Sequence, residues 1–131
     1  MMSRSPFGTW NGIDTWSIFP GVTLHAIGGD QVLMCRVAYE PGTTVKRHSH
    51  EATEQLMWLV EGTLRMTIGD ETRELVAGDV AVVNRQVEHE LFSETGCVFV
   101  EALAPVPLDH VPDRARDLVL GDLAGSLHVE R

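Results

Sequence analysis

The chain has 131 residues with 10 Lys or Arg and 19 Asp or Glu, and its formal net charge of −9 argues against nucleic acid as a partner. The length predicts a single domain, and an apolar fraction of 44% with 22% charged residues excludes a disordered or collagen-like chain. Charged residues, proline or glycine interrupt every apolar stretch before it could span a membrane, and residues 1–10 show no apolar segment of a secretory signal.

The predicted elements begin with an irregular N-terminal arm, residues 1–20, in which two tryptophans lie among Gly, Pro, Asn and Ser. Residues 21–104 form the expected domain, because short apolar runs alternate there with turn residues. The runs cover residues 22–27, 31–39, 55–60, 63–68, 72–76, 80–83, 89–92 and 97–103, and one of the turns is expected at Glu61-Gly62. Short strands without a helical period predict an all-β fold, an antiparallel sandwich or barrel.

The C-terminal tail, residues 105–131, begins where the strand pattern ends. Pro112 and Asp113 suit the start of a helix and Gly121 suits its end, which predicts a short helix over residues 113–120. No internal repeat or low-complexity segment divides the chain, so we expect one domain with two different ends.

The stretch from His48 to Gln55 is the most informative one for function. Residues i and i+2 of a strand point to the same side, so His48 and His50 are expected to project together. Two neutral imidazoles aimed at one place suit a divalent transition metal. The pair alone is equally compatible with an exposed or hydrogen-bonded histidine pair, and both interpretations stay open on this motif by itself.

The wider pattern is Gly-x5-His-x-His-x4-Gln-x6-Gly, from Gly42 to Gly62, followed by Gly78-Asp79 and then by His89. This ordered set resembles the two motifs of the cupin superfamily. The resemblance implies a single small jelly-roll β-barrel with a metal ion inside it. Between Gly78 and His89 the family usually has a Pro-x-Gly turn. Here Asn84-Arg85-Gln86 stands in its place, and since Asn84 can adopt a left-handed turn conformation, we expect the turn to be kept.

The resemblance also implies the ligand set of the metal, which is His48, His50, Gln55 and His89. Glu54 is the alternative to Gln55, but the family's six-residue interval to the closing glycine fits only Gln55. Imidazole and amide ligands suit one divalent transition ion, which can be zinc, nickel, iron, manganese or copper. Because all four ligands are neutral, the ion would keep its full charge and favour a substrate that binds as an anion or becomes one.

Strand alternation predicts which side chains line the pocket around this ion. If Gln55 and His89 face inward, the inner wall consists of Met57, Leu59, Leu91, Phe99 and Leu103. Glu101 shares the face of its neighbours Phe99 and Leu103, and an acid between apolar residues is unusual. Glu101 is therefore the candidate catalytic acid or base, the alternative being an outward-facing, solvated carboxylate.

Within the cupins, the chain is similar to the small, single-domain KdgF-like proteins of pectin degradation, which open the ring of unsaturated uronates to a linear keto form. The similarity rests on the four ligands and on Pro20-Gly21-Val22, residues 37–42, 67–69 and 78–80. After the last strand, that family carries an acid and an arginine that serve the uronate. Glu101 stands at the place of the acid, but Pro107 stands at that of the arginine, so the bidentate partner of a sugar carboxylate is missing.

Three functions follow as hypotheses. The first is a metal-dependent enzyme that isomerises, cyclises or ring-opens a small oxygenated metabolite through an enolate, with Glu101 as the proton-transfer group. The others are an iron-dependent dioxygenase and a non-catalytic cupin that binds a small ligand. Glu101 favours an enzyme, because a binding protein needs no proton-transfer group beside the metal.

The cysteines and the strand edges of the barrel indicate the expected cellular location and oligomeric state. Cys35 and Cys97 lie in apolar runs without the spacing of a zinc site or a disulfide framework, so we interpret them as buried thiols of a cytoplasmic protein. A small barrel has open strand edges, and cupins commonly pair, so we expect a homodimer. The expected partners are a small-molecule substrate and a second copy of the chain, without nucleic acid or membrane.

Overall fold

The computed structural model describes residues 7–13, 15, 17, 19–28, 31–106 and, for the backbone alone, 127–128. The helix predicted over residues 113–120 lies outside the described residues. Within them the only helical segment is the short 3-10 turn η1 (Trp10–Gly12), and no helix there has the length and apolar character needed to cross a membrane.

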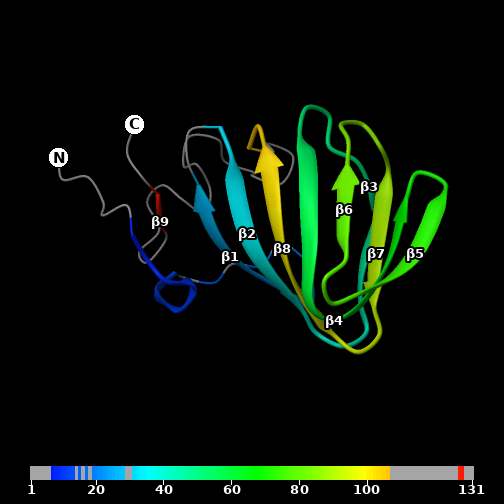
Figure 1. Ribbon diagram of the computed structural model, residues 1–131, viewed down its shortest axis with the longest axis horizontal. Coiled ribbons are helices and arrows are strands. Elements are labelled where there is room, and N and C mark those ends of the chain that lie inside the picture. The colour runs from blue at the N-terminus through cyan, green and yellow to red at the C-terminus, as the bar shows by residue number, and fades with distance from the viewer. Residues whose placement is uncertain are drawn as a thin grey trace.

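The described part of the chain is built from strands that curl into one sheet (Figure 1). The strands are β1 (Val22–Gly28), β2 (Leu33–Tyr39), β3 (Thr43–His48), β4 (Glu54–Ile68), β5 (Glu71–Val76), β6 (Val80–Val83), β7 (His89–Ser93), β8 (Cys97–Ala104) and β9 (Leu127–His128). Their order is β3-β7-β4-β8-β2-β1-β9, and β5 and β6 also pair with β4. The prediction of a single all-β barrel is confirmed.

Strand β4 connects the two sides of the barrel. Its first half pairs with β8 and β6, and its second half pairs with β7 and β5, all antiparallel. The register with β8 shifts by one residue between Leu59 and Glu61, so Val60 forms a bulge where β4 bends from one side of the barrel to the other. The turn predicted at Glu61-Gly62 is therefore wrong, because the strand continues through the bulge.

Gly62 is required at this bend for two reasons. Its φ of 82° lies in the left-handed region, and a Cβ there would collide with the carbonyl oxygen of Gly96 and lie 2.7 Å from the Cα of Cys97. Gly42 has the same φ of 82° but nothing within 4 Å of such a Cβ. The two glycines therefore separate the cost of the backbone conformation from the cost of the collision.

We expect Gly42→Ala to lower the free energy of unfolding by about 1–2 kcal/mol, the ordinary penalty for a left-handed residue with a side chain. Gly62→Ala should cost more than Gly42→Ala, because backbone atoms must also move. Urea denaturation of both variants measures the difference. Equal losses for the two variants would contradict the steric role of Gly62.

Alternation along β4 separates a buried from an exposed set of side chains. Gln55, Met57 and Leu59 are buried, whereas the residues between them are exposed. The buried side joins a core that fills the barrel and to which β1, β2, β3, β4, β6, β7 and β8 all contribute. The polar residues discussed next lie at one end of this core.

Candidate metal centre

Three histidines converge on one place in the structure. His48 ends β3 and lies directly opposite His89, the first residue of β7, while His50 follows two residues after His48. The ring centroids are 4.2 Å apart for His48 and His89, 5.3 Å for His48 and His50, and 5.2 Å for His50 and His89. Each ring offers one nitrogen to a group whose members all lie within 4.8 Å of one another, which is compatible with a single bound metal ion.

A bulge in β3 brings His48 to this place. Val45 is opposite Leu91 and His48 is opposite His89, so three steps along β3 match two steps along β7. Strict alternation from the buried Val45 would turn Arg47 inward, but Arg47 is exposed. Because of the extra residue, the side chain of His48 points inward instead.

Two backbone carbonyls orient the imidazoles. The Nδ1 of His48 donates to the carbonyl oxygen of Lys46 at 2.6 Å, and the Nδ1 of His89 donates to that of Val87 at 3.0 Å. Since a carbonyl can only accept, the hydrogen is assigned to Nδ1, and Nε2 is the nitrogen suited to a metal. Burial is the main cause that lowers the pKa of His89 to about 4, so this ring is neutral near pH 7, as a metal ligand must be.

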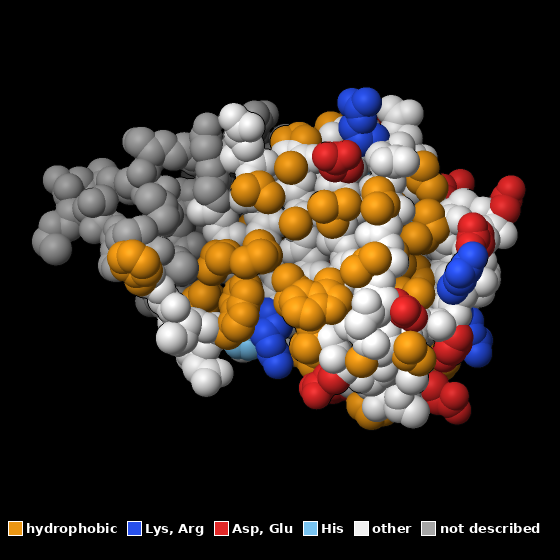
Figure 2. All heavy atoms as spheres, in the orientation of Figure 1, with side chains coloured by type: hydrophobic (Ala, Val, Ile, Leu, Met, Phe, Trp, Pro, Cys, Tyr) orange, Lys and Arg blue, Asp and Glu red, His pale blue; other side chains and the backbone are white. Residues whose placement is uncertain are grey.

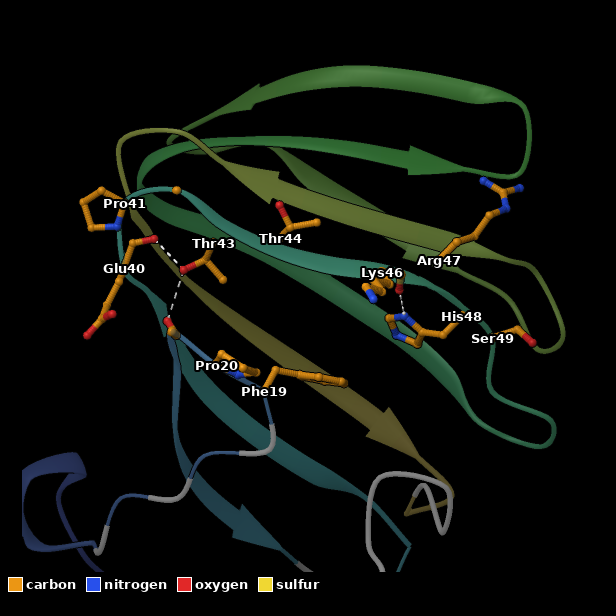
Figure 3. A pocket seen from close by; sticks show the side chains of 12 residues that line it. Phe19, Pro20, Glu40, Pro41, Thr43, Thr44, Lys46, Arg47, His48 and Ser49 are labelled. Carbon is orange, nitrogen blue, oxygen red and sulfur yellow. Dashed lines mark hydrogen bonds between the residues drawn. The ribbon is translucent and has the colours of Figure 1, made fainter.

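A groove beside β3 includes one member of this cluster, His48, in its lining (Figure 3). Phe19 and Pro20 form one wall and β3 forms the other, enclosing about 800 Å³. His48 lies along this groove, with its ring centroid 6.2 Å from that of Phe19. Arg47 also lines the groove, and its guanidinium forms ion pairs with Glu88 and Glu90. A small molecule can therefore approach His48 through the groove.

Gln55 is a buried side chain at the start of β4, whereas its neighbour Glu54 is exposed. The Nε2 of Gln55 donates to Oε2 of Glu101 at 2.6 Å. Its other polar atom, Oε1, is buried and has no hydrogen-bond partner among the described residues. A buried oxygen without a partner calls for an explanation, and a bound cation is one that fits an amide oxygen.

Glu101 lies on β8 in register between Met57 of β4 and Cys35 of β2. The residues two positions away on β8, Phe99 and Leu103, are buried, and Glu101 itself is partly buried. Desolvation raises the pKa of Glu101 to about 7, against the opposite effect of the hydrogen bond from Gln55. A carboxyl group in this state can accept or release a proton near neutral pH.

Two further titratable groups lie near Glu101. Burial raises the pKa of the Cys35 thiol and the Tyr39 hydroxyl well above their usual values, and the Glu101 carboxylate adds to both shifts. Tyr39 also packs edge-on against Phe99, with ring centroids 5.4 Å apart. Nothing in the sequence around Tyr39 distinguishes it as a site residue, because a strand tyrosine is an ordinary core residue.

The predicted site residues thus fall into three groups. His48, His50 and His89 form one cluster, and Gln55 is joined to Glu101 by a hydrogen bond. The five predicted wall residues are all buried members of the core: Met57, Leu59, Leu91, Phe99 and Leu103.

The turn before His89 is kept, at Arg85 and Gln86. Its residue with positive φ is Gln86, at 67°, rather than Asn84. The N–H of Gln86 donates to the carbonyl oxygen of His50 at 2.7 Å, and the N–H of Val87 donates to that of Asn84 at 3.3 Å. The left-handed residue thereby links the second motif to the backbone of the first.

Comparisons with known proteins agree with this fold. The profile of the cupin domain matches residues 35–102. Among solved structures, KdgF from Halomonas sp. has a TM-score of 0.71 at 19% identity, over 77% of this chain and 95% of that one. An RmlC-like cupin from Shewanella frigidimarina has a TM-score of 0.76 at 20% identity, over 85% of this chain and 100% of that one.

A sugar phosphate isomerase of the cupin superfamily from Silicibacter pomeroyi has a TM-score of 0.64 at 19% identity, over 72% of each chain. Identities this low show a shared fold and no more, and no curated protein sequence matches the chain. The domain profile covers more than half of the sequence and both histidine motifs. The chain therefore belongs to the cupin domain family.

Proposed function

We propose that the chain is a metal-dependent enzyme that isomerises, cyclises or ring-opens a small oxygenated metabolite. The observation that carries this proposal is the pairing of Gln55 with Glu101. The pairing turns one polar atom of the amide toward the carboxyl group and leaves the other, Oε1, without a partner. Gln55, whose Oε1 would be the ligand atom, thereby lies beside the proton-transfer group, with 2.6 Å between its Nε2 and Oε2 of Glu101.

His48, His50, His89 and Gln55 would hold the ion, which fits the neutral rings and the unpartnered amide oxygen. A bound divalent ion would supply a Lewis acid that polarises a substrate carbonyl or hydroxyl. Glu101 would take a proton from the carbon beside that carbonyl and return it elsewhere on the substrate. Its raised pKa near 7 suits both directions of transfer.

The core side chains beside Glu101 would exclude water from the reacting carbon. Leu103 and Phe99 flank it along β8, and Met57 faces it from β4. We propose that these three, with Leu59 and Leu91, shape the inner wall against the substrate. The similar structure described as a sugar phosphate isomerase is consistent with a small oxygenated substrate. We further propose that the enzyme acts as a homodimer in the cytoplasm.

Deuterium exchange tests the chemistry without a known substrate. The metal-loaded protein would be incubated in D2O with a panel of uronates, sugar phosphates and keto acids, followed by NMR and by an oxygen electrode. Deuterium incorporation that needs both the metal and Glu101 supports the proposal. Oxygen consumption with iron would instead indicate the dioxygenase, and binding without exchange or turnover would indicate a non-catalytic cupin.

The fourth ligand can be tested on metal affinity alone. We expect Gln55→Leu, which removes a direct ligand, to weaken metal binding by more than the roughly 10–100-fold typical of outer-shell groups. Glu54→Leu, at the exposed neighbouring position, is the matched control and should bind as the wild type does. Competition titration with a metallochromic chelator gives both affinities. Weaker metal binding by Glu54→Leu together with unchanged binding by Gln55→Leu would show that Glu54, and not Gln55, is the ligand.

A further inference from the structure

The groove beside β3 contains the only lysine of the chain. The other nine basic residues are all arginines, and Lys46 lies on the exposed side of β3. Its side chain lines the groove together with His48, one of the three clustered histidines (Figure 3). An ammonium group is thereby placed in the space through which a small molecule can approach the candidate metal centre.

The backbone of Lys46 is tied to the histidine cluster. Its carbonyl oxygen accepts the hydrogen bond from Nδ1 of His48 at 2.6 Å, which fixes the position of this backbone relative to the imidazole. The ammonium group takes no part in that hydrogen bond. A change of the lysine side chain should therefore leave the orientation of His48 unchanged.

The two cations that line the groove differ in their partners. The guanidinium of Arg47 forms ion pairs with Glu88 and Glu90. It also donates a hydrogen bond to the carbonyl oxygen of Gly69 at 3.0 Å. Within the described part of the chain, no carboxylate forms an ion pair with Lys46. An ammonium group beside a groove, without a carboxylate partner of its own, is suited to bind an anionic group of a ligand.

The distribution of charge along the groove indicates how such a ligand would lie. The acidic residue of the lining, Glu40, comes before β3, at the end of the groove away from His48 (Figure 3). Lys46 lies at the His48 end, and a divalent ion held by neutral ligands would add its own charge there. This end of the groove therefore favours a negatively charged group, although the chain has a net charge of −9.

We propose that Lys46 determines substrate specificity by binding a carboxylate or phosphate group of the substrate. The inference rests on the proposed function and names its substrate class, a small oxygenated molecule that carries an anionic group. Phe19 and Pro20, on the other wall of the groove, would contact the less polar part of this molecule. Its anionic group would lie on Lys46 while another of its oxygen atoms faces the histidine cluster.

Isothermal titration calorimetry with three hexoses tests the inference, on both the zinc-loaded and the metal-free protein. D-Glucuronate carries a carboxylate, D-glucose 6-phosphate carries a phosphate and D-glucose carries neither, while the sugar is otherwise the same. At least one of the two anionic hexoses should bind about 10-fold more tightly than D-glucose, as expected for a hydrogen bond to a charged group. The comparison of the two anionic hexoses shows which anionic group fits.

Lys46→Gln should weaken the binding of the anionic hexose about 10-fold and leave metal content unchanged. Lys46→Arg retains the positive charge and should keep the preference for an anionic hexose. Arg73→Gln is the matched control, because it removes one positive charge from β5, outside the groove. Arg73 is paired with Glu71, and Figure 2 shows basic side chains beside acidic ones over β5. This control should bind all three hexoses as the wild type does.

The single lysine allows a second measurement. Acetylation of Lys46, followed by peptide mass spectrometry, should slow down when the anionic hexose is bound and keep its rate with D-glucose. A failure of the proposed function would appear as a wild type without metal or without deuterium exchange. The metal-free protein should even then prefer the anionic hexose, so the two failures are distinguishable.

Three results would overturn the inference. The first is that neither anionic hexose binds more tightly than D-glucose. The second is an unchanged affinity for the anionic hexose in Lys46→Gln, which would assign the anionic group to Arg47 if Arg47→Gln lost that affinity. The third is a loss in Arg73→Gln as large as that in Lys46→Gln, which would indicate a general effect of net charge.

Discussion

Untagged wild-type protein should carry close to one divalent transition ion per chain, and the double variant His48→Ala/His89→Ala should carry almost none. The two rings lie opposite each other with centroids 4.2 Å apart, so the variant removes two of the three clustered imidazoles. Each alanine removes a direct ligand, and we expect affinity to fall by more than the roughly 10–100-fold typical of outer-shell groups. Elemental analysis after dialysis measures the content.

Thermal unfolding provides a second measure of the same change. A ligand that binds only the folded state at 100 times its dissociation constant adds about 2.7 kcal/mol to stability. A chelator should therefore lower the melting temperature of the wild type and leave that of the double variant unchanged. His25→Ala, on β1 and outside the histidine cluster, should behave as the wild type does. Low metal in the wild type that does not change in the double variant would contradict a histidine metal site.

Glu101→Gln should reduce turnover by about 10²–10⁴-fold while metal content and fold stay intact, once a substrate is found. The amide cannot take up a proton as a carboxylate does. Its carbonyl oxygen can still accept the hydrogen bond that Gln55 donates to Oε2 of Glu101, so Gln55 should keep its orientation. Steady-state kinetics and elemental analysis on the same preparation measure both quantities.

Glu101→Leu is the informative companion variant. Leucine cannot accept the hydrogen bond, so this variant should lose metal affinity as well as turnover. Wild-type turnover in Glu101→Gln would show that the carboxyl group moves no proton. Loss of metal in Glu101→Gln to the level of Glu101→Leu would show that Glu101 only positions Gln55.

Much of the candidate site could be predicted from the sequence, because strand alternation has a fixed period. Counting along β4 from Gln55 predicts Met57 and Leu59 on one side and Trp58 on the other, and the structure has them there. His89 could be identified only through the second cupin motif, since nothing in its immediate neighbours suggests a partner 41 residues away. The tertiary pairing of β3 with β7 brings it to His48.

The remaining features depend on bulges and on a left-handed turn residue, which the two-residue period of a strand does not predict. The extra residue in β3 turns the His48 side chain inward. The bulge at Val60 makes one bent strand where a turn was expected at Glu61-Gly62. The left-handed conformation falls on Gln86, where the backbone hydrogen bond to His50 requires it, although Asn84 has the better intrinsic preference. The bond between Gln55 and Glu101 joins strands 46 residues apart.

Anomalous scattering from crystals of the untagged protein tests the central claim most directly. The account predicts one peak about 2.0–2.2 Å from the Nε2 atoms of His48, His50 and His89 and from Oε1 of Gln55. Its absorption edge would name the metal. A map with no peak at the histidine cluster after growth with each candidate metal, or a peak bound by other side chains, would contradict the account.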